Sequence, residues 1–288
     1  MPQENLLKKI KELREITGVG FKDCKSVIDE TNGDIEKSII LLRKKGIAKA
    51  GKRMARVAAE GLIYINEKDN KILIIEINSE TDFVAKNKDF INFGKEVSAI
   101  ALTKLGERDK FLNSEMKNKK TVNDSLIDLV SKIGEKITIR REAFVDNKSI
   151  NFSYIHSSIE NNVGKLGVIL SLKTSQKKEE LSDLGKQLAM HIAASAPLAL
   201  DKEDLDKSLI DKEKEIIVDE LKNSGKDPKI IDKIAIGKLN KFINDNTLLN
   251  QEWIIDPKKK VKDIIKEFSA NEKIEIESFI RFKVGEGL

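Results

Sequence analysis

The feature that most constrains this chain is a pattern that occurs twice along it. The segment FINFGKEVSAIAL, residues 90–102, aligns without gaps with the start of LSDLGKQLAMHIAAS, residues 181–195. Each segment follows two strand-like runs, LIYIN and KILIIEIN in the first copy and FSYIH and KLGVILSLK in the second. Turn-forming residues separate the two runs of each pair, as in a β-hairpin. We therefore expect an α+β fold with a duplicated core of hairpins and helices.

A closing strand repeats in the same order. The run EKITI at residues 135–139 corresponds to EKIEI at residues 272–276. The helices are offset by 91 residues (181 − 90) and the closing strands by 137 (272 − 135), so the second copy is longer by 46 residues (137 − 91). In the helices, the matched positions are Phe90 with Leu181, Phe93 with Leu184, Gly94 with Gly185, Lys95 with Lys186, and Val97 with Leu188.

The extra length of the second copy lies at about residues 201–242, where charged residues surround a narrow apolar seam. The turn-forming residues Asn223-Ser224-Gly225 and Pro228 divide this stretch into two helical arms. Such a narrow seam is typical of a helix pair that packs on itself, so we predict a protruding antiparallel helical hairpin. The seam residues are Leu205, Leu209, Ile216 and Leu221 in the first arm and Ile230, Ile231, Ile234 and Leu239 in the second.

The first 46 residues predict a separate bundle of three short helices. Apolar residues recur at helical spacing, and Gly18-Val19-Gly20, Asn32-Gly33 and Gly46 end the successive stretches. The arrangement is similar to a ubiquitin-associated domain, and so small a core suits a docking module. The expected domains are this module at 1–46, a basic Ala-rich linker at 47–60, the first core subdomain at 61–146 and the second at 147–288.

The composition favours a soluble intracellular protein. The chain has 53 basic and 48 acidic residues, a net charge of +5, which is too balanced for a dedicated nucleic-acid binder. Its one cysteine, Cys24, excludes an intramolecular disulfide and a cysteine-rich metal site. No apolar run approaches the ~20 residues of a membrane-spanning helix, and the N-terminus lacks the composition of a signal peptide. We expect a cytoplasmic protein without membrane or direct nucleic-acid contact.

The linker IAKAGKRMARVAAEG allows two interpretations. Most runs of this kind are solvated and contact nothing. The alternative is a nucleic-acid contact through Lys49, Lys52, Arg53 and Arg56.

Catalytic and metal-binding motifs are missing from the sequence. The histidines, His156 and His191, have no clustered metal-ligand partners, and none of HExxH, CxxC, GxSxG or GxxxxGK[ST] occurs. We therefore expect a protein that acts by binding, with no catalytic residues, no bound metal and no cofactor.

The stretch NSETDFVAKN, residues 78–87, is the candidate binding element. Thr81 can cap a helix, with Asp82 in its first turn, where a carboxylate favours the positive end of the helix dipole. Phe83 then occupies the second helical position. Its ring either folds back into the core, as most phenylalanines do, or is presented at the helix tip as an interface anchor.

Four motifs together resemble the translation elongation factor Ts family. They are TDFVAKN after the first hairpin, LREITGVGFKDCK near the start, AMHIAAS in the second copy and FIRFKVGEG at the end. The resemblance runs from about Leu6 to Leu288 in the family's order. It implies a guanine-nucleotide exchange factor for the GTPase elongation factor Tu (EF-Tu), binding its GDP-bound and nucleotide-free forms, and it also admits a 2:2 assembly.

The resemblance also implies roles for particular residues. Thr81, Asp82, Phe83 and Val84 would form the tip that inserts between helices of the GTPase domain and disturbs the coordination of the nucleotide-bound Mg²⁺. Arg14, Phe21 and Lys25 would make the contacts of the N-terminal module, and His156 would lie on the partner-facing side of the core. This chain departs from the family in two ways. Phe21-Lys22 replaces the usual pair of methionines, and the C-terminal helical module of some members is not expected after Leu288.

Two rival functions stay open at the level of sequence. One is an RNA- or ribosome-associated binder that uses the basic run at residues 43–56. The other is an adaptor whose N-terminal module binds peptides or ubiquitin-like folds.

Overall fold

The chain forms a mixed α+β fold in two compact units. The computed structural model describes residues 3–17, 19–53, 56–146, 148–223, 228–269 and 272–288. The first unit comprises Met1–Phe144, Ser157–Lys165 and Phe282–Leu288, and the second comprises Val145–His156 and Leu166–Arg281. The finer division into four segments expected from the sequence stays a prediction.

Three N-terminal helices enclose a small apolar cluster. They are α1 (Gln3–Thr17), α2 (Phe21–Glu30) and α3 (Ile35–Arg53). The cluster consists of Ile10, Leu13, Cys24, Val27, Ile28 and Leu42. All six are among the positions at which apolar residues recur with helical spacing, whereas Ile16 and Phe21, which share that spacing, are exposed.

The predicted end of the third helix at Gly46 is wrong, because α3 continues to Arg53. Alanine, lysine and arginine are good helix formers, so the residues after Gly46 extend the helix. Gly46 has a different role. A Cβ atom there would collide with the side chain of Ser131 on α7 (Val122–Ile133). The glycine therefore allows a close approach of the helices instead of ending one.

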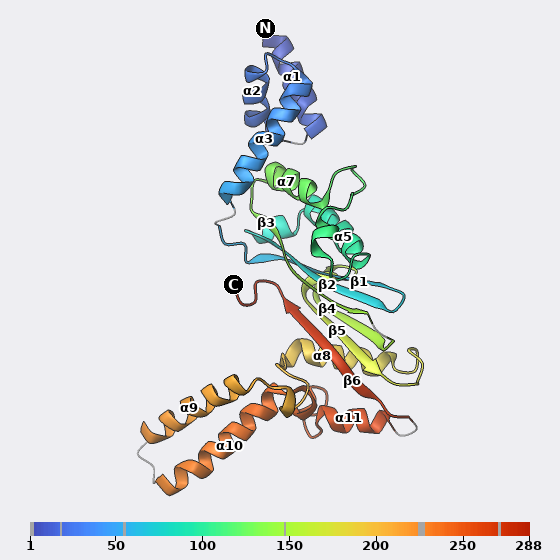
Figure 1. Ribbon diagram of the computed structural model, residues 1–288, viewed down its shortest axis with the longest axis vertical. Coiled ribbons are helices and arrows are strands. Elements are labelled where there is room, and N and C mark those ends of the chain that lie inside the picture. Colours follow the sequence, from blue (N-terminus) through green and yellow to red (C-terminus); the bar gives the residue numbers. More distant parts are fainter. Residues whose placement is uncertain (1–2, 18, 54–55, 147, 224–227, 270–271) are drawn as a thin grey trace. The chain divides into compact units, whose positions relative to one another are not determined.

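The first repeat follows the predicted order of elements. Its hairpin packs against α5 (Lys88–Leu102), α7 packs against α5 in turn, and the core includes Leu62, Tyr64, Ile75, Phe90 and Val97 (Figure 1). Gly134 has a left-handed conformation, φ 92°, and ends α7 as predicted. The elements are β1 (Glu60–Lys68), β2 (Lys71–Ser79), α4 (Asp82–Ala85), α5 (Lys88–Leu102), α6 (Arg108–Leu112), α7 and β3 (Ile137–Asp146).

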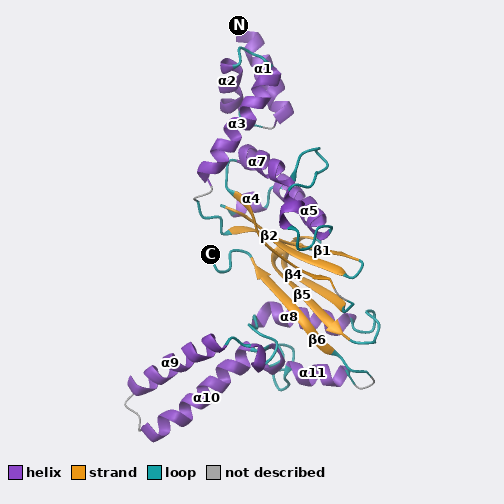
Figure 2. Cartoon of the chain, viewed as in Figure 1, coloured by secondary structure: helices purple, strands orange, loops and turns teal. Residues whose placement is uncertain are grey.

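The second repeat has the same pairing of strands as the first. Its elements are β4 (Ile150–Glu160), β5 (Val163–Lys173), α8 (Ser182–Ser195), α11 (Val261–Phe268) and β6 (Glu275–Lys283). In the first repeat, β3 pairs with β2, the second strand of the hairpin. In the second repeat, β6 pairs with β5 in the same way (Figure 2). The strand order is β3-β2-β1-β5-β4, and β1 pairs with Val163 and Gly164 at the start of β5.

A shared close contact supports the duplication at the level of packing. A Cβ atom at Gly94 on α5 would overlap the ring of Tyr64 on β1. A Cβ atom at Gly185 on α8 would overlap the ring of Phe152 on β4. In both repeats, an aromatic ring of the hairpin therefore lies directly on the helix backbone. This explains why the two glycines align in the sequence.

The insertion in the second unit forms two helices that pack on each other. These are α9 (Lys207–Asn223) and α10 (Pro228–Asn246), and the short turns η1 (Lys202–Asp204) and η2 (Leu248–Asn250) flank them (Figure 1). Ile217 lies in the seam and Ile216 is 54% exposed, so the assignment of Ile216 to the seam is wrong by one residue. Leu205 is buried but precedes α9, and the predicted turn at 224–227 lies outside the described residues.

Candidate partner-binding site

The segment after β2 folds as its own one-turn helix, α4. Thr81 has an extended backbone, and its hydroxyl accepts a hydrogen bond from the Val84 amide at 3.5 Å. Asn87 then caps the next helix by accepting from the Asp89 amide at 2.8 Å. Because two caps lie six residues apart, the chain forms a short turn and then restarts as α5.

The Phe83 ring is 80% exposed, the highest value among the large apolar side chains that the structure describes. Its neighbours Val84 and Ala85 are buried in the core of the first repeat. The interpretation in which the ring folds back into the core is therefore wrong. An exposed aromatic ring above two buried residues is a protrusion with a fixed base, as an interface anchor requires.

Asp82 and Lys86 form an ion pair next to this ring. The Lys86 ammonium donates to the Asp82 carboxylate at 2.8 Å. This hydrogen bond lowers the pKa of Asp82 below its ordinary value and raises the pKa of Lys86. Asp82 is therefore ionised at neutral pH and stands at the first position of α4.

Two glutamates that the sequence reasoning missed hold the base of α4. The Glu135 carboxylate accepts from the Thr81 amide at 3.0 Å and from the Thr81 hydroxyl at 2.9 Å. Glu80 accepts from the Lys136 amide at 2.6 Å. The signal that could have found Glu135 is the repeated Glu-Lys-Ile run, which by itself indicates only the start of a strand.

The predicted contacts of the N-terminal module lie in two places. Phe21, which is 44% exposed, and Lys25 line an apolar depression of about 280 Å³ with Leu6, Leu7 and Ile10. Arg14 lines a different, more polar depression with Lys11, Glu15 and Val19. The structure therefore brings Phe21 and Lys25 together and places Arg14 apart from them.

Comparisons with known proteins point to one family. The sequence profile of the family described as "Elongation factor TS" matches residues 80–286, which begin at the base of α4. Proteins named "Elongation factor Ts" from Bartonella quintana and Nitrobacter hamburgensis are 43% and 40% identical to this chain. Each alignment covers 97% of this chain and 92% of the relative. The chain belongs to the elongation factor Ts family. It is therefore a protein of translation elongation.

In this member of the elongation factor Ts family, His156 lies at the surface of the second unit. It is exposed on β4, and its Nδ1 lies 3.1 Å from the hydroxyl of Tyr154. His191 is instead a core residue. It stacks on Trp253, and its Nε2 hydrogen-bonds to Gln251 at 3.0 Å, while burial lowers its pKa. Of the two histidines, only His156 is accessible to a partner.

The cysteine and the basic residues after Gly46 offer no further site among the side chains that the structure describes. Burial raises the pKa of the Cys24 thiol, which makes it a poor nucleophile. Arg56 is paired with Glu80 at 3.1 Å, whereas the side chains of Lys49, Lys52 and Arg53 lie outside the described ones.

The described part of the chain offers neither a metal site nor a membrane span. No group of three or more His, Cys, Asp or Glu side chains is placed there to hold a metal ion. None of its helices combines the length and apolar character needed to cross a bilayer.

Proposed function

We propose that this protein is a guanine-nucleotide exchange factor for EF-Tu and that α4 is its wedge. The observation that carries the proposal is the 80% exposure of Phe83 above a capped and anchored helical turn. In the proposed complex, the ring enters between helices of the GTPase domain. There it disturbs the coordination of the nucleotide-bound Mg²⁺, which neutralises the phosphates, so GDP leaves and GTP can rebind.

The proposed mechanism is differential binding without a covalent step. The factor binds nucleotide-free EF-Tu more tightly than GDP-bound EF-Tu. By linkage, the factor weakens the binding of GDP to EF-Tu as much as bound GDP weakens the binding of the factor to EF-Tu. No residue of this chain acts as a catalyst in this scheme, and no cofactor takes part in it.

The four residues of the tip have different parts in the proposal. Phe83 supplies the apolar wedge, and Asp82 adds a negative charge beside it. Val84 is 7% exposed, so it supports the ring from below, and Thr81 fixes the start of the turn. In the free protein, Lys86 screens the charge of Asp82. The same lysine then balances that carboxylate when the tip is removed from water.

The N-terminal module docks the factor onto EF-Tu in this proposal. Phe21 and Lys25 offer an apolar contact beside a positive charge, and Arg14 offers a second positive charge on α1. The apolar contact is thus kept at the first position of the replaced methionine pair. His156 is a further proposed contact, from the second unit. A 2:2 assembly with EF-Tu is part of the same proposal.

A mixing experiment tests the proposed function. EF-Tu is loaded with a fluorescent GDP analogue and mixed with excess unlabelled GDP, with and without this protein. We expect the protein to accelerate release of the analogue in a saturable way. We also expect tighter binding to nucleotide-free EF-Tu than to the GDP-bound form. Unchanged release at every concentration, or equal affinity for the two forms, would contradict the proposal.

A further inference from the structure

The base of α4 is connected to a residue far along the chain. Glu135 lies between Gly134, which ends α7, and the start of β3. Its two carboxylate oxygens accept from the amide of Thr81 at 3.0 Å and from the hydroxyl of Thr81 at 2.9 and 3.1 Å. Because the hydroxyl proton is directed to Glu135, an oxygen lone pair is left for the Val84 amide. The cap of α4 is therefore oriented from outside the helix.

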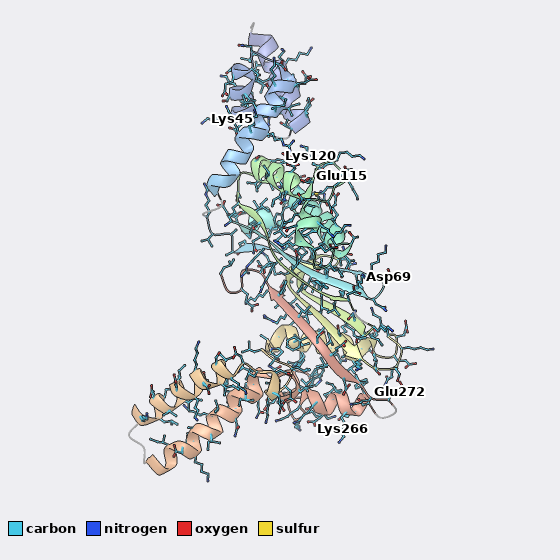
Figure 3. The ribbon with its side chains drawn as sticks, viewed as in Figure 1. Lys45, Asp69, Glu115, Lys120, Lys266 and Glu272 are labelled. Carbon is cyan, nitrogen blue, oxygen red and sulfur yellow. The ribbon has the colours of Figure 1, made fainter. Side chains whose placement is uncertain are left out.

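The hydroxyl part of this clamp has a counterpart in the second repeat. The carboxylate of Glu272, labelled in Figure 3, accepts from the hydroxyl of Ser175. Glu272 is the counterpart of Glu135 in the repeated Glu-Lys-Ile run. Ser175 follows the end of β5 by two residues, as Thr81 follows the end of β2. The contact between this carboxylate and the hydroxyl after the hairpin is thus part of the duplicated scaffold.

The two repeats differ in the segment that comes after the clamp. Nine positions separate Thr81 from Phe90, but only six separate Ser175 from the matching Leu181. The three additional residues of the first repeat fall where α4 forms. Between Ser175 and α8, the second repeat has turns but no helix of its own. The exposed ring therefore stands on an insertion that begins directly at the clamp.

From this arrangement we infer that Glu135 is a positioning residue for nucleotide exchange, an inference that rests on the proposed function. Glu135 fixes the residue from which α4 starts, and Phe83 lies two residues further on. Its carboxylate therefore sets the direction in which the ring is presented. A ring ordered before contact gives up less conformational entropy on binding. Without the clamp, the ring stays exposed but samples more orientations.

The test compares Glu135→Gln with the matched control Glu272→Gln. In Glu135→Gln, an amide NH₂ replaces one acceptor oxygen and the negative charge is lost, so the N–H and O–H of Thr81 must share the one remaining oxygen. Because hydrogen bonds to a charged group are replaced by weaker neutral ones, we predict GDP release from EF-Tu that is slower by about tenfold. Glu272→Gln makes the same chemical change where no tip is attached, and it should release GDP at the wild-type rate.

A double-mutant cycle separates positioning from general damage. If Glu135 acts through the ring, Glu135→Gln should slow GDP release when Phe83 is present. In the Phe83→Ala variant, the same substitution should change the rate of GDP release by less than about twofold. Thr81→Val removes the hydroxyl that Glu135 accepts from and should behave like Glu135→Gln. Equal slowing in both Phe83 backgrounds, or wild-type exchange by Glu135→Gln, would overturn the inference.

A second readout does not depend on exchange activity. Deuterium uptake by the amides of residues 82–86 should rise in Glu135→Gln and stay at the wild-type level in Glu272→Gln. Unchanged uptake in Glu135→Gln would also overturn the inference. If the wild-type protein itself does not accelerate GDP release, the proposed function fails, and this uptake measurement still decides whether Glu135 orders the tip.

Discussion

At the scale of single residues, two neighbours in sequence differ in burial, and the difference depends on the fold around them. Phe83 is exposed and Val84 is buried, although both are apolar. The sequence predicted the cap at Thr81 because capping depends on local backbone geometry. It left the position of the ring open because that depends on the residues that lie beneath α4. It missed Glu135 because the clamp joins residues 54 positions apart.

Glu76 provides a residue-scale prediction about stability and pH. Its carboxylate is fully buried on β2 and accepts from Arg140, Arg141, Asn78 and the Gly285 amide. Burial alone would raise its pKa, but these hydrogen bonds together outweigh that effect and hold the pKa below its ordinary value. Removing Glu76 takes the buried carboxylate away from two arginines and leaves the Gly285 amide without its acceptor. Glu76→Ala should therefore lower the free energy of unfolding by about 3–5 kcal/mol at pH 7.

The sign of the pH dependence comes from the lowered pKa of Glu76. The ionised carboxylate contributes its full stability above the unfolded-state pKa of about 4.3 and loses it as the pH falls through the lower folded-state pKa. Urea unfolding at pH 7 and at successively lower pH below 4 measures the free energy of unfolding of both proteins. The difference in this free energy between wild type and Glu76→Ala should become smaller as the pH falls. Glu115→Ala, at an exposed ion pair (labelled in Figure 3), is the control and should have little effect. A difference independent of pH would contradict this assignment.

At the scale of elements, the repeat was the most reliable guide because it combines local pattern with long-range agreement. The hairpins, the end of α7 at Gly134 and the matched helices α5 and α8 were all predicted correctly. The predictions of helix ends and of the seam between α9 and α10 were less accurate. Gly46 resembles a helix stop in sequence, yet it permits contact with Ser131. Ile216 and Ile217 are adjacent isoleucines, and only packing against α10 distinguishes them.

The matched glycines give an element-scale prediction. Gly→Ala inside a helix ordinarily stabilises it, but Gly94 and Gly185 lie against the rings of Tyr64 and Phe152. Gly94→Ala and Gly185→Ala should each destabilise the protein by about 1–3 kcal/mol through overpacking. Gly237→Ala on α10 meets nothing within 4 Å and should instead stabilise its helix by up to ~1 kcal/mol. Urea unfolding followed by circular dichroism measures all three; stabilisation by Gly94→Ala would contradict the proposed close packing.

At the scale of the whole molecule, the sequence indicated the order of the parts along the chain, and several motifs together indicated the family. The N-terminal helices, the first repeat and the second repeat with its insertion appear in the predicted order. Each compact unit is made of separate stretches of chain, because residues 157–165 and 282–288 belong to the first unit. Strands β4, β5 and β6 therefore each contribute residues to both units.

Docking by the N-terminal module is a prediction at this scale. If Lys25 contacts EF-Tu, Lys25→Glu should weaken association by about three- to tenfold and leave the maximal rate of GDP release at saturation unchanged. Lys44→Glu changes the same charge at an exposed position of α3 and is the matched control. Half-saturation in the release assay measures the effect. Equal effects of the two substitutions would show general charge attraction instead of a specific contact.

The central claim is that one exposed ring drives exchange, and Phe83→Ala tests it most directly. Because the ring is 80% exposed, its removal should change the free energy of unfolding by no more than about 0.5 kcal/mol. Phe268→Ala, which removes another exposed ring on α11, serves as the control. At saturating factor, Phe83→Ala should release fluorescent GDP from EF-Tu at least about tenfold more slowly than wild type, as for an interface anchor of ~2 kcal/mol, while Phe268→Ala matches wild type. Release by folded Phe83→Ala at the wild-type rate would contradict the account.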